Sequence, residues 1–328
     1  MRIVLCYPIE SRHYDQIVAA CPPGTEVINA GQERIAAELP TADIFCGHAK
    51  VPVPWPEVVR GGQLNWIQSS AAGLDHCLVP EVIASDIQVT SASGLFADQV
   101  AEQTLALLLG LIRGLPTFFR AAQKKEFIRR PTLDLHGSTV GIVGLGGNGT
   151  RIAQVLRPFK TRIIATDMFP GEIDSANGLV DAIWPADKLD LLLAESDIVI
   201  LCVPLNTQTR HMIAGPQLAR MKNGSLLINV ARGEVVQEID LVSALSSGHL
   251  AGAGLDVTEV EPLPASSPLW DLPNVIITPH VGAQSRRRAD DTTNLTCDNL
   301  HRYFAGQKLL NLVDKTRGYP TPAARRGE

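Results

Sequence analysis

The sequence predicts an α/β protein with two domains, each built on a mostly parallel, doubly wound sheet. Short runs rich in β-branched residues alternate with polar or helical segments along most of the chain. The chain has 328 residues, which exceeds the usual size of a single hydrophobic core. Hydrophobic residues make up 45% of it and charged residues 19%, a composition typical of folded globular proteins.

The first domain begins with a series of short predicted strands. They span residues 3–7, 25–29, 43–46, 64–68 and 87–90. From residue 97 to residue 127 the pattern changes to that of one long helix, with Val100, Leu108 and Ile112 on its apolar face. We expect this helix to join the two domains.

A second α/β series begins after Pro131. Its predicted strands span residues 139–143, 162–165, 198–203, 225–230, 253–257 and 275–278. Strands joined by helical segments in this way fit a doubly wound sheet. A last helical segment at 286–305 precedes the apolar run 309–313, which we expect to pack back on the first domain. The first domain then comprises residues 1–98 and 284–328, and residues 99–283 form a second domain inserted within it.

Charge and composition disfavour several classes of partner. The formal net charge is −5, whereas nucleic-acid binding needs an excess of Lys and Arg on one face. We find no signal peptide and no uncharged stretch long enough for a membrane span, so we expect a cytoplasmic protein without a membrane partner. The cysteines are scattered and form no Cys-x-x-Cys pair, and we interpret none of them as a metal ligand or nucleophile. They are Cys6, Cys21, Cys46, Cys77, Cys202 and Cys297.

A glycine-rich segment follows the strand predicted at 139–143 and precedes a predicted helix at 150–156. Gly144, Gly146 and Gly149 have the spacing of a dinucleotide-binding turn. The first glycine allows the tight turn, the second lets a pyrophosphate approach the backbone, and the third lets helix and strand pack closely. Asp167 ends the next strand, where a carboxylate binds ribose hydroxyls and favours NAD over NADP. The sequence therefore predicts an NAD cofactor.

Polar residues follow three consecutive strands of the second domain. They are Arg232, Glu261 and His280. Each alone is typical of a loop or a helix cap, but the carboxyl ends of parallel strands share the edge where ligands bind, so together they indicate a site. His280 can transfer a proton, Glu261 can orient and charge the ring, and Arg232 can bind a carboxylate and a carbonyl. This combination predicts hydride transfer between NAD and C2 of a small 2-hydroxy or 2-keto acid.

These motifs, in this order, resemble those of the D-isomer-specific 2-hydroxyacid dehydrogenases. The segments that carry the resemblance are 144–149 with Asp167, 229–233, 254–257 with 261–264, and 274–282. The resemblance covers nearly the whole chain. It implies that Arg232, Glu261 and His280 are the catalytic residues, and that a Rossmann NAD-binding domain is inserted in a flavodoxin-like substrate domain.

The same resemblance implies further binding residues. Asp256 is expected to contact the nicotinamide amide. The other residues expected at the cofactor are Gly147, Asn148, Val203, Pro204, Thr209, Val230, Ala231, Arg232, His280 and Gly282. Gly147 and Asn148 depart from the residues that the family often has there. Ala72 and Gly73 lie in a stretch that resembles the loop whose amides bind the substrate carboxylate, with Arg232 and His280 as the other substrate-binding residues.

Two contacts and two other functions remain open at this stage. His48 and Lys50 follow a strand on the loop that in this family faces the substrate tail, although an exposed lysine is more often only solvated. One alternative function is that of a formate dehydrogenase-like enzyme. Such enzymes resemble this chain but have Gln at the position of Glu261, so Glu261 favours a hydroxy acid substrate. An NAD-sensing regulatory protein, similar to the corepressors of this fold, is the other alternative.

The region around residues 115–119 also predicts an assembly. Leu115, Phe118 and Phe119 add more apolar surface to the predicted helix than two domains of this size need for their connection. Dimers of the family that the chain resembles are built around this region. We therefore expect a homodimer.

Overall fold

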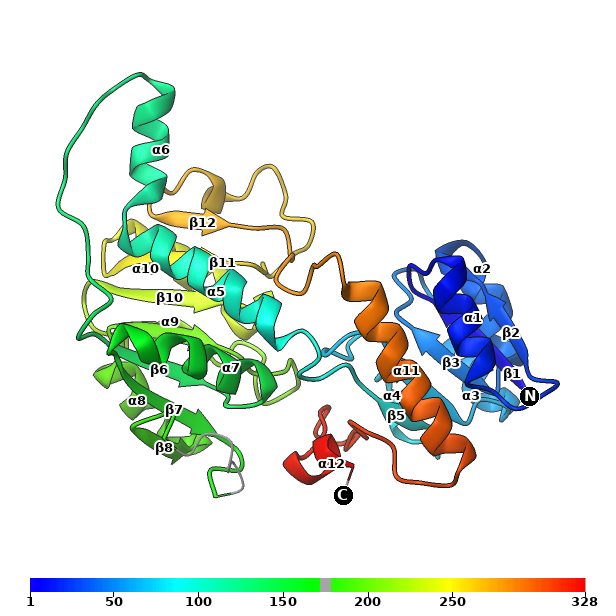
Figure 1. Ribbon diagram of the computed structural model, residues 1–328. Coiled ribbons are helices and arrows are strands. Elements are labelled where there is room, and N and C mark those ends of the chain that lie inside the picture. Colours follow the sequence, from blue (N-terminus) through cyan, green and yellow to red (C-terminus); the bar gives the residue numbers. More distant parts are fainter. Residues whose placement is uncertain (172–177, 328) are drawn as a thin grey trace. The chain divides into compact units, whose positions relative to one another are not determined.

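A computed structural model of the protein describes residues 1–171 and 178–327 (Figure 1). The chain divides into two compact units. Unit 1 comprises Met1–Phe96 and Ser285–Glu328, and unit 2 comprises Ala97–Gln284. The sequence-based boundaries, 98/99 and 283/284, lie close to these, and Glu328 itself is outside the described residues.

Unit 1 contains a parallel sheet with strand order β2-β1-β3-β4-β5. The strands are β1 Arg2–Cys6, β2 Glu26–Asn29, β3 Ile44–Gly47, β4 Trp66–Ser69 and β5 Gln88–Thr90. This order is that of a flavodoxin-like sheet, and it confirms the predicted fold class.

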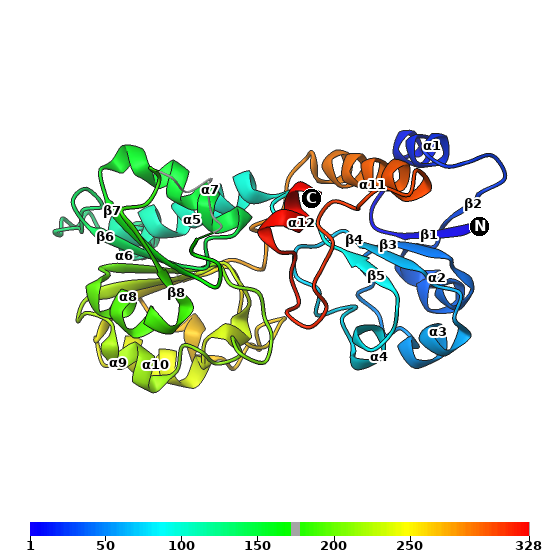
Figure 2. The same ribbon diagram turned by 90° about the horizontal axis from the view of Figure 1, so that it is seen from below.

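Helices cover both faces of the unit 1 sheet (Figure 2). One face carries α1 (Ser11–Ala19) and α11 (Arg288–Phe304), which bury Ile17 and Leu300. The opposite face carries α2 (Gly31–Glu38), α3 (Trp55–Gly61) and α4 (Pro80–Ile83). A short helix, α12 (Pro322–Arg326), ends the described chain. The strands therefore read as apolar runs because both of their faces are buried.

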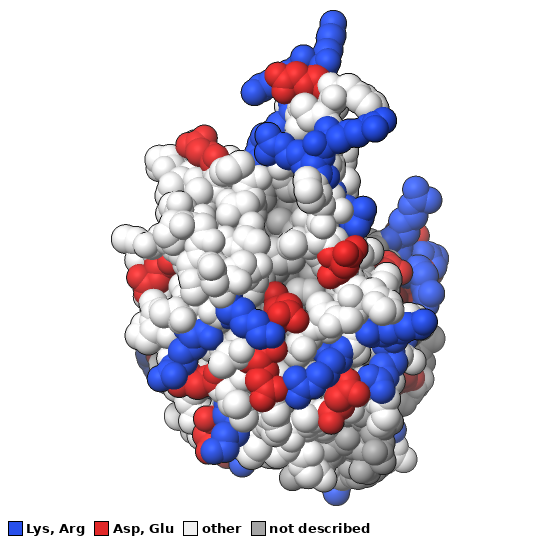
Figure 3. Space-filling model, turned by 90° about the vertical axis from the view of Figure 1, so that its left-hand side faces the viewer, with Lys and Arg blue, Asp and Glu red and all other residues white. Residues whose placement is uncertain are grey.

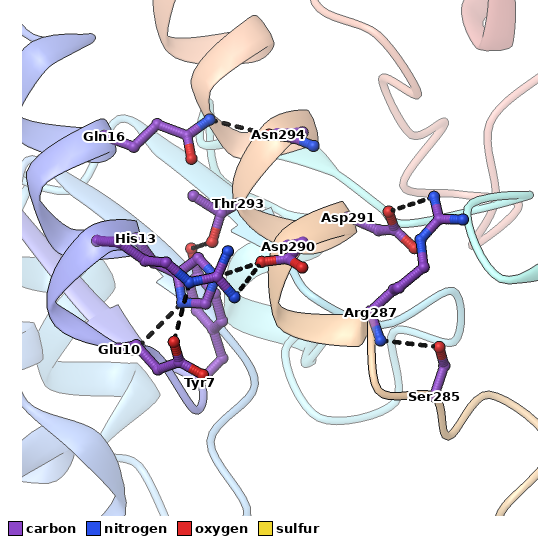
Figure 4. Close-up of polar contacts among 11 residues, drawn as sticks. Tyr7, Glu10, His13, Gln16, Ser285, Arg287, Asp290, Asp291, Thr293 and Asn294 are labelled. Atoms are coloured by element: carbon purple, nitrogen blue, oxygen red, sulfur yellow. Dashed lines mark hydrogen bonds and ion pairs between the residues drawn. The ribbon is translucent and has the colours of Figure 1, made fainter.

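The contact between α1 and α11 is centred on the buried side chain of His13 (Figure 4). Its Nδ1 accepts a hydrogen bond from the Glu10 amide at 3.0 Å, so the proton is on Nε2, which donates to Asp290 Oδ1 at 2.7 Å. Arg12 pairs with the same oxygen at 2.6 Å, and the Tyr7 and Thr293 hydroxyls are hydrogen-bonded at 3.2 Å. These contacts attach the returning end of the chain to its beginning.

The run 309–313 packs on the first part of the chain, as the sequence predicted. The Val313 amide donates to the Val89 carbonyl at 2.8 Å, and Leu312 forms a β-bridge with Thr90. Leu309 and Val313 are both buried in unit 1. Unit 1 is therefore assembled from two segments that unit 2 separates in the sequence.

Unit 2 contains a seven-stranded parallel sheet with order β12-β11-β10-β9-β6-β7-β8. The strands are β6 Thr139–Val143, β7 Arg162–Asp167, β8 Ala182–Pro185, β9 Ile198–Leu201, β10 Ser225–Asn229, β11 Leu250–Leu255 and β12 Val275–Ile277. The sequence did not predict β8, because this short edge strand pairs only with β7 and has no buried residue. The direction of strand order reverses between β6 and β9, which is where such sheets bind ligands.

The helices of unit 2 also form two layers (Figure 2). α5 (Ala97–Ile112) and α7 (Gly147–Leu156) cover one face of the sheet. α8 (Leu189–Glu195), α9 (Gly215–Arg220) and α10 (Glu238–Ser246) cover the other. Both sheet faces are therefore buried in apolar cores.

The prediction of a single long helix at 97–127 is wrong. The structure has α5, which ends at Ile112, and then α6 (Leu115–Gln123), with a bend of 68° between them. Gly114 has a φ of 67°, and Pro116 lacks the amide that a continuous helix would need. Among the described residues no single helix is long and apolar enough to cross a membrane. Only the bent pair of α5 and α6 together has the length and apolar composition of such a segment.

Candidate active site

Three neighbouring strands of unit 2 bring the predicted catalytic side chains to one edge of the sheet. β10, β11 and β12 are adjacent, and Arg232, Glu261 and His280 follow their carboxyl ends. His280 Nδ1 lies 2.8 Å from Glu261 Oε2. A carboxylate only accepts hydrogen bonds, so Nδ1 carries a proton and Nε2 is left for another partner.

The charge state of Glu261 follows from its surroundings. Burial raises the pKa of Glu261, but the hydrogen bond and charge of His280, the Thr258 amide and the charge of Arg232 together hold it below its usual value. The Thr258 amide donates to Glu261 Oε1 at 3.2 Å. Glu261 is therefore a carboxylate at neutral pH.

The backbone at His280 adopts an uncommon conformation. Its φ is 53°, in the left-handed region that few non-glycine residues occupy. The His280 amide donates to the Asp256 carbonyl at 2.7 Å, which holds the residue there. A strained residue fixed by its neighbours is common at functional sites.

Asp256 organises the loop that carries His280. Its Oδ1 accepts from the Thr278 hydroxyl at 2.6 Å and from the Val281 amide at 3.0 Å, and its Oδ2 accepts from the Gly282 amide at 2.8 Å. Gln103 on α5 donates to the Thr278 hydroxyl at 2.8 Å. Asp256 is buried, so these bonds satisfy a carboxylate that would otherwise be costly to bury. The structure thus gives Asp256 a role in shaping the loop that the sequence did not predict.

The loop that carries Arg232 is also fixed internally. Asn229, the last residue of β10, donates to the Arg232 carbonyl at 2.9 Å and accepts from the Ala231 amide at 3.0 Å. These bonds form a local turn that includes Val230. Arg232 Nη1 donates to the Ala231 carbonyl at 2.8 Å. The side chains of Asn229 and Ala231 are buried, so the loop is anchored at the sheet edge.

The glycine-rich segment has the geometry of a dinucleotide-binding turn. Gly144 has a φ of 93°, and a Cβ on Gly149 would lie 2.1 Å from the Gly144 carbonyl oxygen. Gly146 precedes α7, which begins at Gly147, so Gly147 and Asn148 are in its first turn rather than before it. The first amides of a helix have no intrahelical acceptor and can bind phosphate. These residues therefore fit the pyrophosphate of a nicotinamide dinucleotide.

Asp167 lies beside this turn at the end of β7. Its Oδ2 accepts from the Leu145 amide at 2.7 Å, and its Oδ1 accepts from the Phe169 amide at 2.9 Å. Each carboxylate oxygen has a second lone pair that can accept a ribose hydroxyl. The position of Asp167 therefore fits the adenosine ribose of the cofactor.

The loop after β9 contains three of the other predicted cofactor residues. Val203 packs against Gly144, with its Cγ1 3.0 Å from the position of a Cβ on that glycine. The Thr209 hydroxyl donates to the Pro204 carbonyl at 2.6 Å and accepts from the Asn206 amide at 2.9 Å. Thr209 thus shapes this loop, in addition to any contact with a ligand.

In unit 1, the loop after β4 contains Ala72 and Gly73. Within the described residues the amides of these two residues donate to no protein group. Ser69 accepts from the Ala71 amide at 3.1 Å and so fixes the start of the loop. Consecutive open amides can bind an anion.

The neighbouring loop of unit 1 carries His48 and Lys50. Gln32 accepts from the Lys50 amide at 2.7 Å and donates to the His48 carbonyl at 2.8 Å. The His48 ring stacks on His76 with centroids 3.9 Å apart. Lys50 itself is exposed.

The cysteines lack the features of reactive thiols. Burial raises the pKa of the Cys6 thiol to about 11 and that of the Cys202 thiol to about 12. Burial also raises the pKa of Cys46 and Cys77. These groups stay protonated at neutral pH, and a protonated thiol is a poor nucleophile.

Residues 105–282 match the model of a known family, described as D-isomer specific 2-hydroxyacid dehydrogenase, NAD binding domain. The matched range is more than half of the chain. The chain belongs to this family. It is therefore an oxidoreductase of hydroxy acids with a Rossmann domain for a nicotinamide cofactor.

Relatives of the chain include named enzymes. A glyoxylate reductase of Korarchaeum cryptofilum is 34% identical over 265 residues, which are 77% of each protein. A glycerate dehydrogenase of Methylorubrum extorquens is 32% identical over 86% of this chain and 88% of its own. Among solved structures, an NADPH-dependent glyoxylate/hydroxypyruvate reductase of Sinorhizobium meliloti, in complex with NADP and sulfate, is 27% identical with a TM-score of 0.80. That match covers 97% of this chain and 99% of the other.

Several residues of this region were not predicted from the sequence. Thr278 donates to the Asp256 carboxylate, Gln103 donates to Thr278, and Asn229 accepts an amide of its own loop. The only sequence signal was a polar residue at or just beyond the end of an apolar strand, which Asn229 and Thr278 share with Arg232 and His280. Gln103 lies within a helix and gave no such signal.

Proposed function

We propose that the protein reduces a small 2-keto acid to the D-2-hydroxy acid with NADH, and catalyses the reverse oxidation with NAD. The observation that carries this proposal is the hydrogen bond of 2.8 Å between His280 Nδ1 and Glu261 Oε2, at the sheet edge that also holds Arg232. When bound, the nicotinamide supplies or accepts the hydride.

Each of the three side chains then has a distinct task. Glu261 holds the ring through Nδ1 and favours its charged form, so the Nε2 proton is available to the C2 oxygen of the substrate. Hydride arrival at C2 places negative charge on that oxygen, and His280 neutralises it by proton transfer. Arg232 binds the substrate carboxylate and carbonyl through its planar group of donors.

The substrate carboxylate has a second set of donors in this proposal, the open amides of Ala72 and Gly73 in unit 1. A 2-keto acid offers both the carboxylate and the adjacent carbonyl that the donors of Arg232 can bind. The names of the relatives, glyoxylate reductase and glycerate dehydrogenase, suggest the first substrates to test.

For the cofactor we propose NAD over NADP. Asp167 accepts two backbone amides beside the glycine-rich turn and so holds a negative charge where the adenosine ribose binds. A 2′-phosphate at that place would meet a like charge, which costs several kcal/mol at close range.

The proposal is tested by NADH oxidation with 2-keto acids of graded size and charge, including glyoxylate and hydroxypyruvate. We expect turnover on the order of 1–10³ s⁻¹ for at least one of them. Oxidation of formate without reduction of any keto acid would favour a formate dehydrogenase-like enzyme. Tight NADH binding without any turnover would favour a regulatory protein that senses the cofactor.

A further inference from the structure

A second histidine–carboxylate pair lies close to Glu261 in the sequence. His211 Nε2 and Glu259 Oε1 are 2.8 Å apart, and both side chains are about one-third or less exposed, at 33% and 26%. Glu259 stands two positions before Glu261 on the same loop. None of the catalytic steps described above uses this pair.

Glu259 also joins its loop to the beginning of α10. The Glu238 amide donates to Glu259 Oε2 at 3.0 Å, and the Glu259 amide donates to Glu238 Oε2 at 3.1 Å. Each carboxylate thus accepts the backbone amide of the other residue. Because Glu238 is the first residue of α10, Glu259 satisfies one of the amides that a helix leaves open at its start.

His211 belongs to a third segment, which is fixed to the same region. Its amide donates to the Glu234 carbonyl at 2.7 Å, and the Ile213 amide donates to the Val235 carbonyl at 3.1 Å. Arg210 and Glu234 form an ion pair at 3.7 Å. The His211 segment is therefore attached to the residues that directly follow Arg232.

The loops of Arg232 and Glu261 touch each other with no space between them. A Cβ on Gly233 would lie 1.9 Å from the carbonyl carbon and oxygen of Thr258. Thr258 in turn donates its amide to Glu261. A shift of the 258–261 backbone would therefore change the position of the Glu261 carboxylate relative to both Arg232 and His280.

We infer that Glu259, with His211 and Glu238, positions the Glu261 carboxylate against His280. This inference rests on the proposed function, because it assigns a task within the same reaction. Glu259 touches neither His280 nor Arg232 in the contacts above, so it is a positioning residue. Its effect passes through the backbone of residues 258–261.

The test is Glu259→Gln, which keeps the size of the side chain and removes its charge. Without the charge of Glu259, its contacts with His211 and the Glu238 amide weaken and the 258–261 loop becomes more mobile. The bond between Glu261 and His280 should then weaken, so reduction should decline at lower pH than in the wild type. We expect kcat to fall about tenfold, because catalysis is sensitive to small displacements of a reacting group. The KM for NADH should stay within about twofold. An unchanged pH profile would overturn the inference.

A double variant separates positioning from simple stabilisation. In a protein that already carries Glu261→Gln, adding Glu259→Gln should shift the pH profile no further, because both changes act on one interaction. Independent, additive shifts would overturn the inference. Glu195→Gln is the matched control, since Glu195 forms an ion pair with Arg162 at 2.8 Å with similar exposure, 35%, and should leave the profile unchanged.

If Glu259→Gln does not fold, His211→Gln tests the same idea while it keeps the bonds between Glu259 and Glu238. It should move the reduction profile in the same direction by a smaller amount, and an unmoved profile with normal thermal stability would contradict the inference. A wild-type protein that reduces no keto acid would instead overturn the proposed function, and this inference with it.

Discussion

In the proposed reaction His280 transfers the proton and Glu261 holds the ring in place. The bond of Nδ1 to the carboxylate 2.8 Å away leaves Nε2 as the ring nitrogen that we propose faces the substrate. Arg232 lowers the pKa of Glu261 further through its charge, so the three residues support one another electrostatically. The proposed proton transfer by His280 therefore depends on the contact of the ring with Glu261.

The replacement Glu261→Gln tests this dependence. It keeps a hydrogen-bond acceptor for the ring but removes the charge that favours the protonated form. In the proposed reaction, reduction uses the protonated ring, so its decline with rising pH should begin at lower pH than in the wild type. Oxidation uses the neutral ring, so its low-pH limb should extend further into acid. Steady-state kcat/KM measured against pH in both directions gives the answer.

Cofactor affinity is the control for that experiment, because Glu261 is not expected to contact the cofactor. NADH binding should change by less than about twofold. A uniform loss of activity with both pH profiles unmoved would mean that Glu261 only supports the structure.

Asp167 carries the prediction about cofactor choice. The wild type should prefer NADH to NADPH by about a hundredfold or more in kcat/KM, since a like-charge contact costs several kcal/mol. Asp167→Ser should narrow the gap mainly by weakening NADH. Asp167→Asn, which keeps an oxygen for the Leu145 or Phe169 amide, separates the charge from the structural role. Equal efficiency of the wild type with both cofactors would contradict the prediction.

From the sequence we could predict the site residues whose residue type and position after a strand already indicate their role. Arg232, Glu261 and His280 follow strands and are the types of residue that transfer protons or bind carboxylates. Gln103 donates to Thr278, which donates to Asp256, and Glu259 accepts the first amide of α10 and pairs with His211. Such roles depend on contacts across the fold, so local sequence pattern could not predict them.

At the scale of the elements, α11 packs on α1 although the two helices are far apart in the sequence. The hydrogen bond from His13 lowers the pKa of Asp290, and the charge of Arg12 lowers it further. A carboxyl group whose pKa is lowered by folding stabilises the native state above its ordinary pKa of about 4, and this contribution is lost as the pH falls through the lowered value.

Asp290→Asn should therefore lower the melting temperature at pH 6–7, and the difference from the wild type should shrink as the pH falls below about 4. Thermal unfolding followed by circular dichroism across this range measures the effect. Asp291→Asn is the control from the same first turn of α11, and its pairing with the exposed Arg287 should matter less. A difference between wild type and Asp290→Asn that persists at acid pH would show that the charge of Asp290 does not stabilise this contact.

The periodicity of apolar residues did not predict two features of the secondary structure, the break between α5 and α6 and the strand β8. The apolar pattern continues from α5 into α6, so only Gly114 and Pro116 indicate the break, and tertiary context decides whether such residues bend a helix or end it. β8 was missed for the opposite reason. Its residues are half-exposed at a sheet edge, and edge strands lack the apolar run that identifies a central strand.

At the scale of the whole molecule, the chain passes between the units twice. These connections lie after Phe96 and after Gln284. The Arg288 guanidinium lies 4.5 Å from the centre of the Phe96 ring, so both connections are attached to each other within unit 1. The sequence predicted this insertion because the apolar run 309–313 follows the second series of strands.

We propose that two copies of the protein associate through the region of α6. Phe119 is 63% exposed and Phe127 is 91% exposed, unusual values for large aromatic side chains. Figure 3 shows Lys and Arg side chains gathered around this segment at the top of the view. Arg120 donates to the carbonyls of Leu272 and Pro273, and these hydrogen bonds attach α6 to the rest of unit 2.

Sedimentation at micromolar concentration should give a dimer of the 35.3 kDa chain, because an interface of ordinary size holds at that dilution. Phe119→Glu should produce a monomer. Ile239→Glu, at a residue that is 72% exposed on α10, should leave the dimer intact. A wild-type protein that sediments only as a monomer would refute the proposal.

The most direct test of the account compares the wild type with His280→Ala in the reduction of a 2-keto acid by NADH. We predict that the wild type forms the D-2-hydroxy acid, and that His280→Ala lowers kcat by about 10²–10⁴-fold, as loss of a general acid does. NADH affinity, measured by fluorescence titration, should change by less than about threefold. A His280→Ala protein that retains wild-type kcat, or a wild type that binds NADH but reduces no 2-keto acid, would contradict it.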